Sequence, residues 1–189
     1  MAKKMRIEKD TLGKVHVPHD AYWGAQTARS IQNFEIGIEK MPKELILAIC
    51  LIKKACAQTN HTYGLLDKKK MLAITAACDE ILAGELASEF PLVIWQTGSG
   101  TQTNMNLNEV IATRANERIT NKKNTKSPIH PNDHVNMSQS SNDVFPSAIH
   151  VAACIEIEKS LLPALNMLQK SLEAKTRVFR SIIKVGRTH

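Results

Sequence analysis

Apolar and polar positions alternate over residues 6–18, on either side of Gly13. Alternation with a period of two is typical of a half-buried strand, and a glycine between two such runs favours a turn. This segment is therefore predicted to form a short β-hairpin. From residue 42 onward the apolar residues recur three and four positions apart, which is the period of a helix. The pattern predicts a mainly α-helical chain with a short hairpin near its start.

Three helices are predicted between residues 42 and 120. The first begins at Pro42 and ends at Gly64, the second is capped by Asp67 and ends near Gly84, and the third begins near Thr103. Proline suits a first helical turn, aspartate accepts from a free N–H at a helix start, and glycine permits the turn that ends a helix. The side chains expected to face the core are Leu45, Ile49, Ile52 and Cys56; Met71, Ile74, Cys78 and Ile81; and Leu107, Val110, Ile111, Ala115 and Ile119.

A polar segment, residues 120–134, leads to a nearly continuous helical pattern that starts at residue 138. Pro146 is expected in its first turn, and Pro163 is an interior proline that should kink the helix. Residues 144–155 carry no charge, and a helix that is apolar on every side is buried on every side. Its neighbours are expected from a missing part of the chain, from other subunits, or from both.

This pattern predicts two domains, an N-terminal helical domain over residues 1–138 and the first part of a long central helical bundle over residues 139–189. The last residues, "KVGRTH", bring no capping or solubilising tail. We therefore expect the sequence to be truncated within the second domain.

The composition is that of a globular protein, with 43% hydrophobic and 23% charged residues. No apolar run is long enough to span a membrane, and the basic start lacks the apolar core of a secretory signal. The four cysteines, Cys50, Cys56, Cys78 and Cys154, form no C-x-x-C pair and lie in apolar helical stretches, which favours buried thiols in a reducing compartment. These features predict a cytoplasmic protein with no membrane partner.

The net charge of +7 leaves open an attraction to nucleic acid or to small anionic metabolites. Aromatic residues make up only 4% of the chain, which is low for a protein that stacks bases. A basic helical RNA-binding module is therefore the weaker alternative, and no nucleic-acid partner is expected.

The segment "WQTGSGTQTNMN", residues 95–106, is rich in hydrogen-bonding side chains and carries no charge. Gly98 and Gly100 allow positive φ and a close approach of backbone N–H groups to a ligand. Neutral hydroxyls and amides beside a helix start suit the binding of a small anion, because the helix dipole favours negative charge there. The neutral donors are Ser99, Thr101, Thr103, Asn104 and Asn106. The alternative is a helix-capping loop that happens to be rich in these residue types.

A second polar segment, "HPNDHVNMSQSSND", covers residues 130–143. His130 and His134 have the spacing of metal ligands only if they share a helical turn, and Pro131 favours a turn with an aspartate or asparagine cap instead. No metal site is therefore expected. The "SSN" residues, 140–142, stand where a helix start presents free N–H groups, although a simple cap would explain them too.

Together with "YWGAQTARSIQNF" from Tyr22 and "GRTH" at residues 186–189, these strings resemble the fumarase/aspartase superfamily, and within it class II fumarase. The resemblance runs from about Arg6 to His189. It implies a lyase, independent of metals and cofactors, that interconverts fumarate and (S)-malate by anti addition of water. It also implies a homotetramer built around a long helical bundle, with a small dicarboxylate as substrate and each active site drawn from three subunits.

The site residues that the resemblance implies fall into three groups. Ser99, Gly100 and Thr101 would bind a substrate carboxylate; Ser140, Ser141 and Asn142 would do the same from a second subunit; and Thr188 would bind substrate beside the catalytic histidine, His189, which handles the proton of the water or hydroxyl. A second dicarboxylate site would comprise His130, Pro131, Asn132 and Asp133.

Two features depart from the family pattern. The family usually has a basic residue three positions before the histidine of the second site, where this chain has Ser127 with Lys126 beside it. The family's mobile glycine–serine–serine loop, whose serine is the carbon-proton base, is absent from this sequence. An incomplete site leaves two alternatives open, an aspartate ammonia-lyase-like enzyme of the same fold and a non-catalytic truncated subunit.

Overall fold

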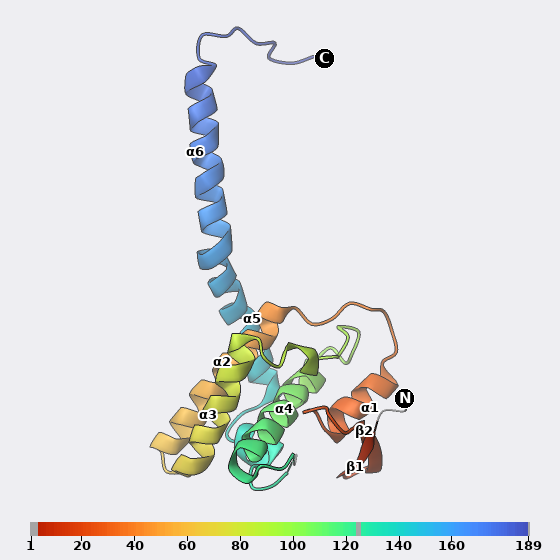
Figure 1. Cartoon of the computed structure of the whole chain (residues 1–189). Coiled ribbons are helices and arrows are strands. Elements are labelled where there is room, and N and C mark those ends of the chain that lie inside the picture. Colours follow the sequence, from red (N-terminus) through yellow and green to blue (C-terminus); the bar gives the residue numbers. More distant parts are fainter. Residues whose placement is uncertain (1–3, 124–125, 189) are drawn as a thin grey trace. The chain divides into compact units, whose positions relative to one another are not determined.

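A computed structural model of the chain describes residues 4–123 and 126–188. It contains two compact units, one up to Ala152 and one from Ala153 onward. The prediction of a mainly helical chain with a short hairpin is confirmed by the order of elements (Figure 1). The predicted domain boundary at residue 138 stays a prediction.

The hairpin consists of β1 (Met5–Asp10) and β2 (Gly13–Pro18), which pair antiparallel with Asp10 opposite Gly13. Gly13 has a φ of 114°, a value that favours glycine over any residue with a side chain. Val15 and Val17 point inward and pack against α1 (Ala25–Asn33), so the alternation seen in the sequence marks one buried and one exposed face.

Three helices lie side by side and form the main core: α2 (Lys43–Thr62), α3 (Lys68–Ala83) and α4 (Thr101–Thr120) (Figure 1). A short 3-10 turn, η1 (Ala87–Glu89), lies between α3 and α4. α4 is buried along most of its length, because α1, α2 and α3 all pack against it. The positions predicted to be buried on α4 are largely confirmed, with Ile119 partly buried and the other four fully buried.

The predicted ends of α3 are confirmed. The Asp67 carboxylate accepts from the Lys70 N–H at 2.9 Å, and Gly84 ends the helix with a φ of 87°. The start of α4 differs from the prediction by two residues, because Gly100, with a φ of 69°, precedes a helix that begins at Thr101.

The buried face of α2 also differs from the prediction. Ile49 is fully buried as expected, but Leu45, Ile52 and Cys56 are only partly buried. The face turned to the core lies one position to the side. Its members are Ile46, Ala48, Ile49, Cys50, Lys53, Ala57 and Asn60. The centre of this face is therefore occupied by a lysine.

A π-helical turn, η2 (Pro131–Val135), and the start of α5 (Ser141–Glu156) complete the first unit. Pro146 is predicted in the first turn of this helix, but α5 begins at Ser141 and Pro146 therefore lies in its second turn. Only Val144 and Ala148 of α5 are fully buried. The described residues thus cover only one face of the uncharged segment 144–155. Burial of this segment on every side, as predicted, would require neighbours from elsewhere.

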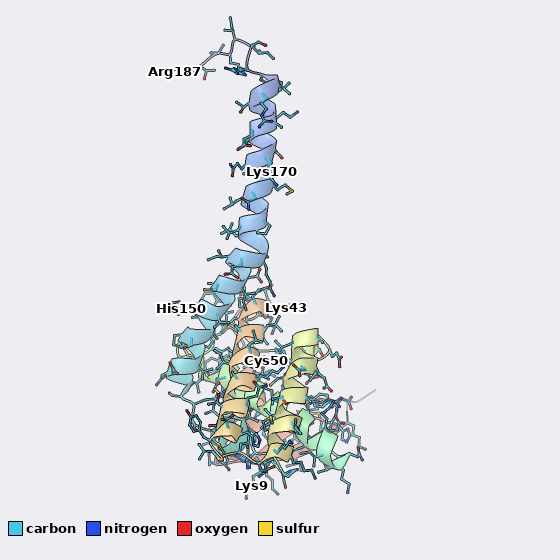
Figure 2. All side chains as sticks on the ribbon, turned by 90° about the vertical axis from the view of Figure 1, so that its left-hand side faces the viewer. Lys9, Lys43, Cys50, His150, Lys170 and Arg187 are labelled. Carbon is cyan, nitrogen blue, oxygen red and sulfur yellow. The ribbon has the colours of Figure 1, made fainter. Side chains whose placement is uncertain are left out.

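The second unit continues helically through a π-helical stretch, η3 (Ile157–Leu161), into α6 (Leu162–Val178). Pro163 is the second residue of α6, but it lies inside a helical stretch that is continuous from α5, as predicted, and the π-helical winding directly before it accompanies the hydrogen bond that the proline cannot donate. The kink itself stays a prediction. The side chains of this unit, Lys170 among them, stand out from the helix into solvent (Figure 2). Among the described residues, no helix is both long and apolar enough to cross a membrane.

Candidate functional site

Two separate features require a glycine at position 100, directly before α4. Gly100 has positive φ, and a Cβ atom built there would lie 2.3 Å from the aromatic ring of Phe145 on α5. Backbone and ring therefore touch at this point, which joins the start of α4 to α5. Gly98 was also expected to adopt a positive φ, but its φ is not positive and a Cβ there would meet no atom within 4 Å.

The first turn of α4 has one N–H group capped and two left open. The Gln96 side-chain oxygen accepts from the Thr103 N–H at 3.0 Å and from the Thr103 hydroxyl at 3.1 Å. Among the described residues none accepts from the N–H of Thr101 or Gln102. Both N–H groups stand at the positive end of the helix dipole, which is where an anion is stabilised.

A row of hydroxyl groups connects the two motifs found in the sequence. Ser99 Oγ lies 2.9 Å from Thr101 Oγ1, and Thr101 Oγ1 lies 3.2 Å from Ser141 Oγ on α5. Thr97 continues the row, because its hydroxyl donates to the Gln102 side-chain oxygen and lies 3.4 Å from Ser99 Oγ. Thr101 and Ser141 thus meet within one chain, whereas Ser140, Ser141 and Asn142 were expected to bind the substrate from a second subunit. Their role in binding stays a prediction.

The start of α5 divides its three candidate residues by role. Ser140 is the cap, since its hydroxyl accepts from the Asn142 N–H at 3.2 Å and its carbonyl accepts from the N–H groups of Asp143 and Val144. The capping alternative therefore explains Ser140. In the described part of the chain, the Ser141 N–H and the Asn142 side chain make no hydrogen bond, so both are available to a ligand.

Beneath this helix start lies a buried polar cluster that the sequence pattern did not predict. Lys53 on α2 is fully buried, and its ammonium group donates to the side-chain oxygens of Asn136 at 2.8 Å and Gln139 at 2.9 Å. Asn104 and Asn108 on α4 donate to the same Asn136 oxygen at 3.1 and 3.2 Å. The sequence does carry a signal, because Lys53 is in helical register with Ile46, Ile49 and Cys50 (Cys50 is marked in Figure 2). The signal is easily missed, because a lysine is normally expected in solvent.

Burial lowers the pKa of Lys53 to about 7, while the thiols of Cys56 and Cys78 act in the opposite direction. No described carboxylate forms an ion pair with its ammonium group. The direct hydrogen-bond partners of the ammonium group among the described residues are thus the neutral side-chain oxygens of Asn136 and Gln139.

A separate pocket of about 700 Å³ holds three of the four residues of the expected second dicarboxylate site. It is lined by Lys9, Asp10, Thr11, Ala25, Gln26, Met105, Glu109, Lys126, His130, Pro131 and Asn132. Asp133, the fourth, is not among the lining residues, and its side chain is 73% exposed. Lys126 brings a basic group to this pocket although position 127 is a serine, and its ammonium group donates to the Lys9 carbonyl.

The two histidines of the second motif are held by their own turn. The His134 Nδ1 accepts from the His130 N–H at 2.9 Å, and burial lowers the pKa of His134. His130 Nδ1 lies 3.3 Å from the Asn132 nitrogen and 3.2 Å from the nearest Asp133 carboxylate oxygen. Within residues 4–123 and 126–188, no group of three or more His, Cys, Asp or Glu is placed to hold a metal ion.

The remaining candidates belong to the second unit. Thr188 is described as an exposed residue beyond α6, and His189, the expected catalytic histidine, lies outside the described residues. The structure therefore brings together the candidates on α4 and α5, and the roles of Thr188 and His189 stay predictions.

Comparison with known proteins gives a consistent result. A family model described as "Lyase" matches residues 13–189. The chain is 54% identical over 187 residues to a class II fumarate hydratase of Rickettsia conorii, a match that covers 99% of this chain and 40% of that protein. It is 58% identical over 189 residues to a mitochondrial fumarate hydratase of Rhizopus oryzae, covering 99% of this chain and 38% of the relative.

Solved structures agree. A class II fumarase from Schistosoma mansoni superposes with a TM-score of 0.94 at 46% identity, covering 98% of this chain and 39% of that one. A fumarate lyase:delta crystallin from Brucella melitensis superposes with a TM-score of 0.93 at 42% identity, covering 98% and 44%. The chain spans about 40% of the length of the curated relatives that it matches.

Proposed function

The chain belongs to the lyase family whose model it matches over residues 13–189, and we propose that it supplies one part of a class II fumarate hydratase. The proposed reaction is the reversible addition of water to fumarate, which gives (S)-malate. The match to relatives named fumarate hydratase, at 54% and 58% identity, supports this assignment over an ammonia-lyase of the same fold.

The observation that carries the proposal is the 3.2 Å separation of the Thr101 and Ser141 hydroxyls at two neighbouring helix starts. Ser99, Gly100 and Thr101 would bind a substrate carboxylate with the open N–H groups of α4. Ser141 and Asn142 would bind it from α5, with Ser140 holding that helix start in place. The two helix dipoles favour the same negative charge.

These neutral donors suit the charge changes of the reaction. Loss of a proton beside a carboxylate gives an aci-carboxylate, in which negative charge grows on the carboxylate oxygens. Hydroxyl and N–H donors that already point at those oxygens stabilise this charge without reorganising, and each such donor is worth roughly 3 kcal/mol of the barrier. Neutral donors also release the product more readily than a fixed cation would.

The proton of the water or hydroxyl group needs an acid or base near neutral pH, which we assign to His189, with Thr188 contacting the substrate. Nothing in this sequence matches the carbon-proton base of the family. We therefore propose that a complete site requires further residues, and that these and the second unit come together in a homotetramer. The exposed leucines of the second unit support such an assembly.

We further propose that His130, Pro131, Asn132 and Asp133 form a second dicarboxylate site, in which Lys126 takes the place of the usual basic residue. Support comes from the pocket that His130, Pro131 and Asn132 share with Lys9 and Lys126. A cytoplasmic location stays a prediction, because the relatives include a protein named as mitochondrial.

A complementation assay tests the main proposal. The chain is purified and fumarate is followed by its ultraviolet absorbance, alone and with the C-terminal part of a relative. The chain alone is expected to be inactive, because it lacks the carbon-proton base, and the mixture is expected to hydrate fumarate. Activity on aspartate in place of fumarate would select the ammonia-lyase, and no activity with any complementing polypeptide would oppose the proposal.

Two substitutions then test the site in the complemented protein. Thr101→Val and Ser141→Ala each remove one hydroxyl donor and are expected to lower kcat by roughly 10²–10³-fold. Thr62→Val is the matched control, because the Thr62 hydroxyl lies exposed at the end of α2 and donates to the Gln58 carbonyl of the preceding helical turn. Equal activity of all three variants would remove Thr101 and Ser141 from the site.

A further inference from the structure

Lys53 occupies a position where a lysine is costly. It is fully buried on α2, and removal of an ammonium group from water costs several kcal/mol unless strong partners replace the water. Its partners are the neutral side chains of Asn136 and Gln139, and no described carboxylate pairs with it. Stability alone gives little reason to keep a cation here, since apolar residues of similar volume often replace buried charges without loss.

Both partners belong to a short turn, residues 136–139, that leads directly into the start of α5. The Asn136 amide nitrogen donates to the Gln139 carbonyl at 3.1 Å, and the Gln139 amide nitrogen donates to the carbonyls of Val135 and Met137. The turn is thus closed on itself by the same two side chains that Lys53 holds. Ser140, the cap of α5, is the next residue.

The cluster also joins this turn to α4. The Asn136 side-chain oxygen accepts from Lys53 on α2 and from Asn104 and Asn108 on α4, so three donors from two helices converge on one atom. The side-chain oxygens of Asn104 and Asn108 are buried without a partner among the described residues. A cluster with acceptors to spare favours an ammonium group, which donates three hydrogens and accepts none.

We propose that Lys53 is a positioning residue, which holds the turn 136–139 against α4 and thereby fixes Ser141 and Asn142 opposite Thr101. The inference rests on the proposed function only for what these residues bind. Lys53 itself touches no substrate. Its charge makes the bonds to Asn136 and Gln139 stronger than a neutral donor could, and these bonds set where α5 begins.

The test compares Lys53→Met with Lys54→Met by hydrogen exchange of the backbone N–H groups of residues 140–144. Lys54 is the matched control, because it is the next residue on α2 and pairs with Asp79 at the surface. Lys53→Met is expected to speed exchange of the Val144 N–H, which bonds the Ser140 carbonyl, by at least about tenfold, and Lys54→Met to leave it unchanged. Wild-type exchange rates in folded Lys53→Met would overturn the proposal.

A second measurement needs no variant to fold. In the wild-type chain, the Lys53 ammonium and the N–H groups of Ser141 and Asn142 are followed by ¹⁵N NMR from pH 6 to 9. The titratable groups that act on Lys53 are the thiols of Cys56 and Cys78. Burial raises the pKa of Cys56. The pKa of Cys78 is raised first by the hydrogen bond with Cys50 and then by burial. The three signals are expected to share one midpoint near pH 7, where Lys53 loses its proton.

Flat Ser141 and Asn142 signals while Lys53 titrates would also overturn the proposal. Lys53→Gln, which keeps one amide donor in the cluster, is expected to recover part of the exchange protection that Lys53→Met loses. None of these readouts uses a substrate. A failure here therefore leaves the hydratase assignment untouched, and an inactive complemented protein would leave the role of Lys53 open to the same measurements.

Discussion

Position 100 imposes two requirements that only glycine meets together. Its φ of 69° is strained for residues with a side chain, and the ring of Phe145 fills the space where a Cβ would stand. The contact places the first N–H groups of α4 beside the start of α5. The proposed anion site therefore depends on the absence of a side chain at Gly100 as well as on the hydroxyls around it.

Substitution of Gly100 by alanine is expected to destabilise the chain by about 1–3 kcal/mol, because the new methyl group must displace the Phe145 ring and the alanine backbone must adopt a left-handed conformation. Urea unfolding monitored by circular dichroism measures the change. Gly98→Ala serves as the control, because its Cβ would meet nothing within 4 Å and its φ is not positive. Equal stability of the two variants would show that the Phe145 contact is relaxed in solution.

The residues of the site differ in how far the sequence predicts them. Ser99, Thr101 and Ser141 were predicted because their strings match a family, and the cap at Asp67 was predicted because a cap is a local feature. The meeting of Thr101 with Ser141 joins residues 40 positions apart, and no local pattern encodes that distance. Lys53 was missed because the buried face of α2 lies one position away from the face that the apolar residues suggested.

Among the elements, the hairpin is fastened to α1 by one carboxylate. The Asp10 side chain accepts from two nitrogens of the Arg29 guanidinium at 2.7 and 2.8 Å and from the Gln26 amide at 3.0 Å. The Arg29 bonds are the main cause that holds the pKa of Asp10 below its ordinary value of 3.8. At its start α1 is also held by Glu109 of α4, which accepts from the backbone N–H groups of Gly24, Gln26 and Thr27.

Because the pKa of Asp10 is lower in the folded chain than in the unfolded chain, its stabilising contribution is complete above about pH 4 and is lost as the pH falls through the folded value. Asp10→Asn is expected to lower the free energy of unfolding at pH 7 by about 1–3 kcal/mol and to flatten its dependence on pH between about 5 and 2. Unfolding in urea at a series of pH values measures both effects. Asp20→Asn, at a fully exposed carboxylate, should change neither, and an unaltered pH dependence of Asp10→Asn would count against the Arg29 pair as its cause.

The element order was predicted well and the ends of single elements less so. Hydrophobic period and capping residues gave the hairpin and the three packed helices, because both signals act over a few residues. The start of α5 was misplaced relative to Pro146, since the cap that fixes it, Ser140, stands in a row of equally suitable polar residues. The π-helical windings at η2 and η3 adjoin Pro131 and Pro163, but a proline alone does not specify a π-helical winding.

At the scale of the whole molecule, the two units differ in how much apolar surface they keep from water. The first has a closed core, whereas residues 157–178 of the second are exposed along their whole length. Four leucines repeat there at alternating spacings of four and three, which is the seam of a helix that packs against other helices. They are Leu161, Leu165, Leu168 and Leu172. This seam supports the proposed assembly through a helical bundle.

Replacement of Leu165, Leu168 and Leu172 by serine in one variant is expected to shift the chain toward monomers, because it removes the apolar area that subunits would bury. Light scattering coupled to gel filtration measures the mass. Met167→Ser is the control, since Met167 is at least as exposed as the three leucines but lies off the seam. A monomeric wild-type chain, or a leucine variant with wild-type mass, would contradict the role given to the seam.

The polar pairing of α4 with α5 and the Lys53 cluster lie entirely within the first 152 residues. During synthesis, the ribosome therefore releases every residue of this pairing and of the Lys53 cluster before the leucine seam has left the exit tunnel. The contact between the Thr101 and Ser141 hydroxyls involves no sister chain. In the proposed assembly, a defect that keeps subunits apart would therefore leave this contact intact.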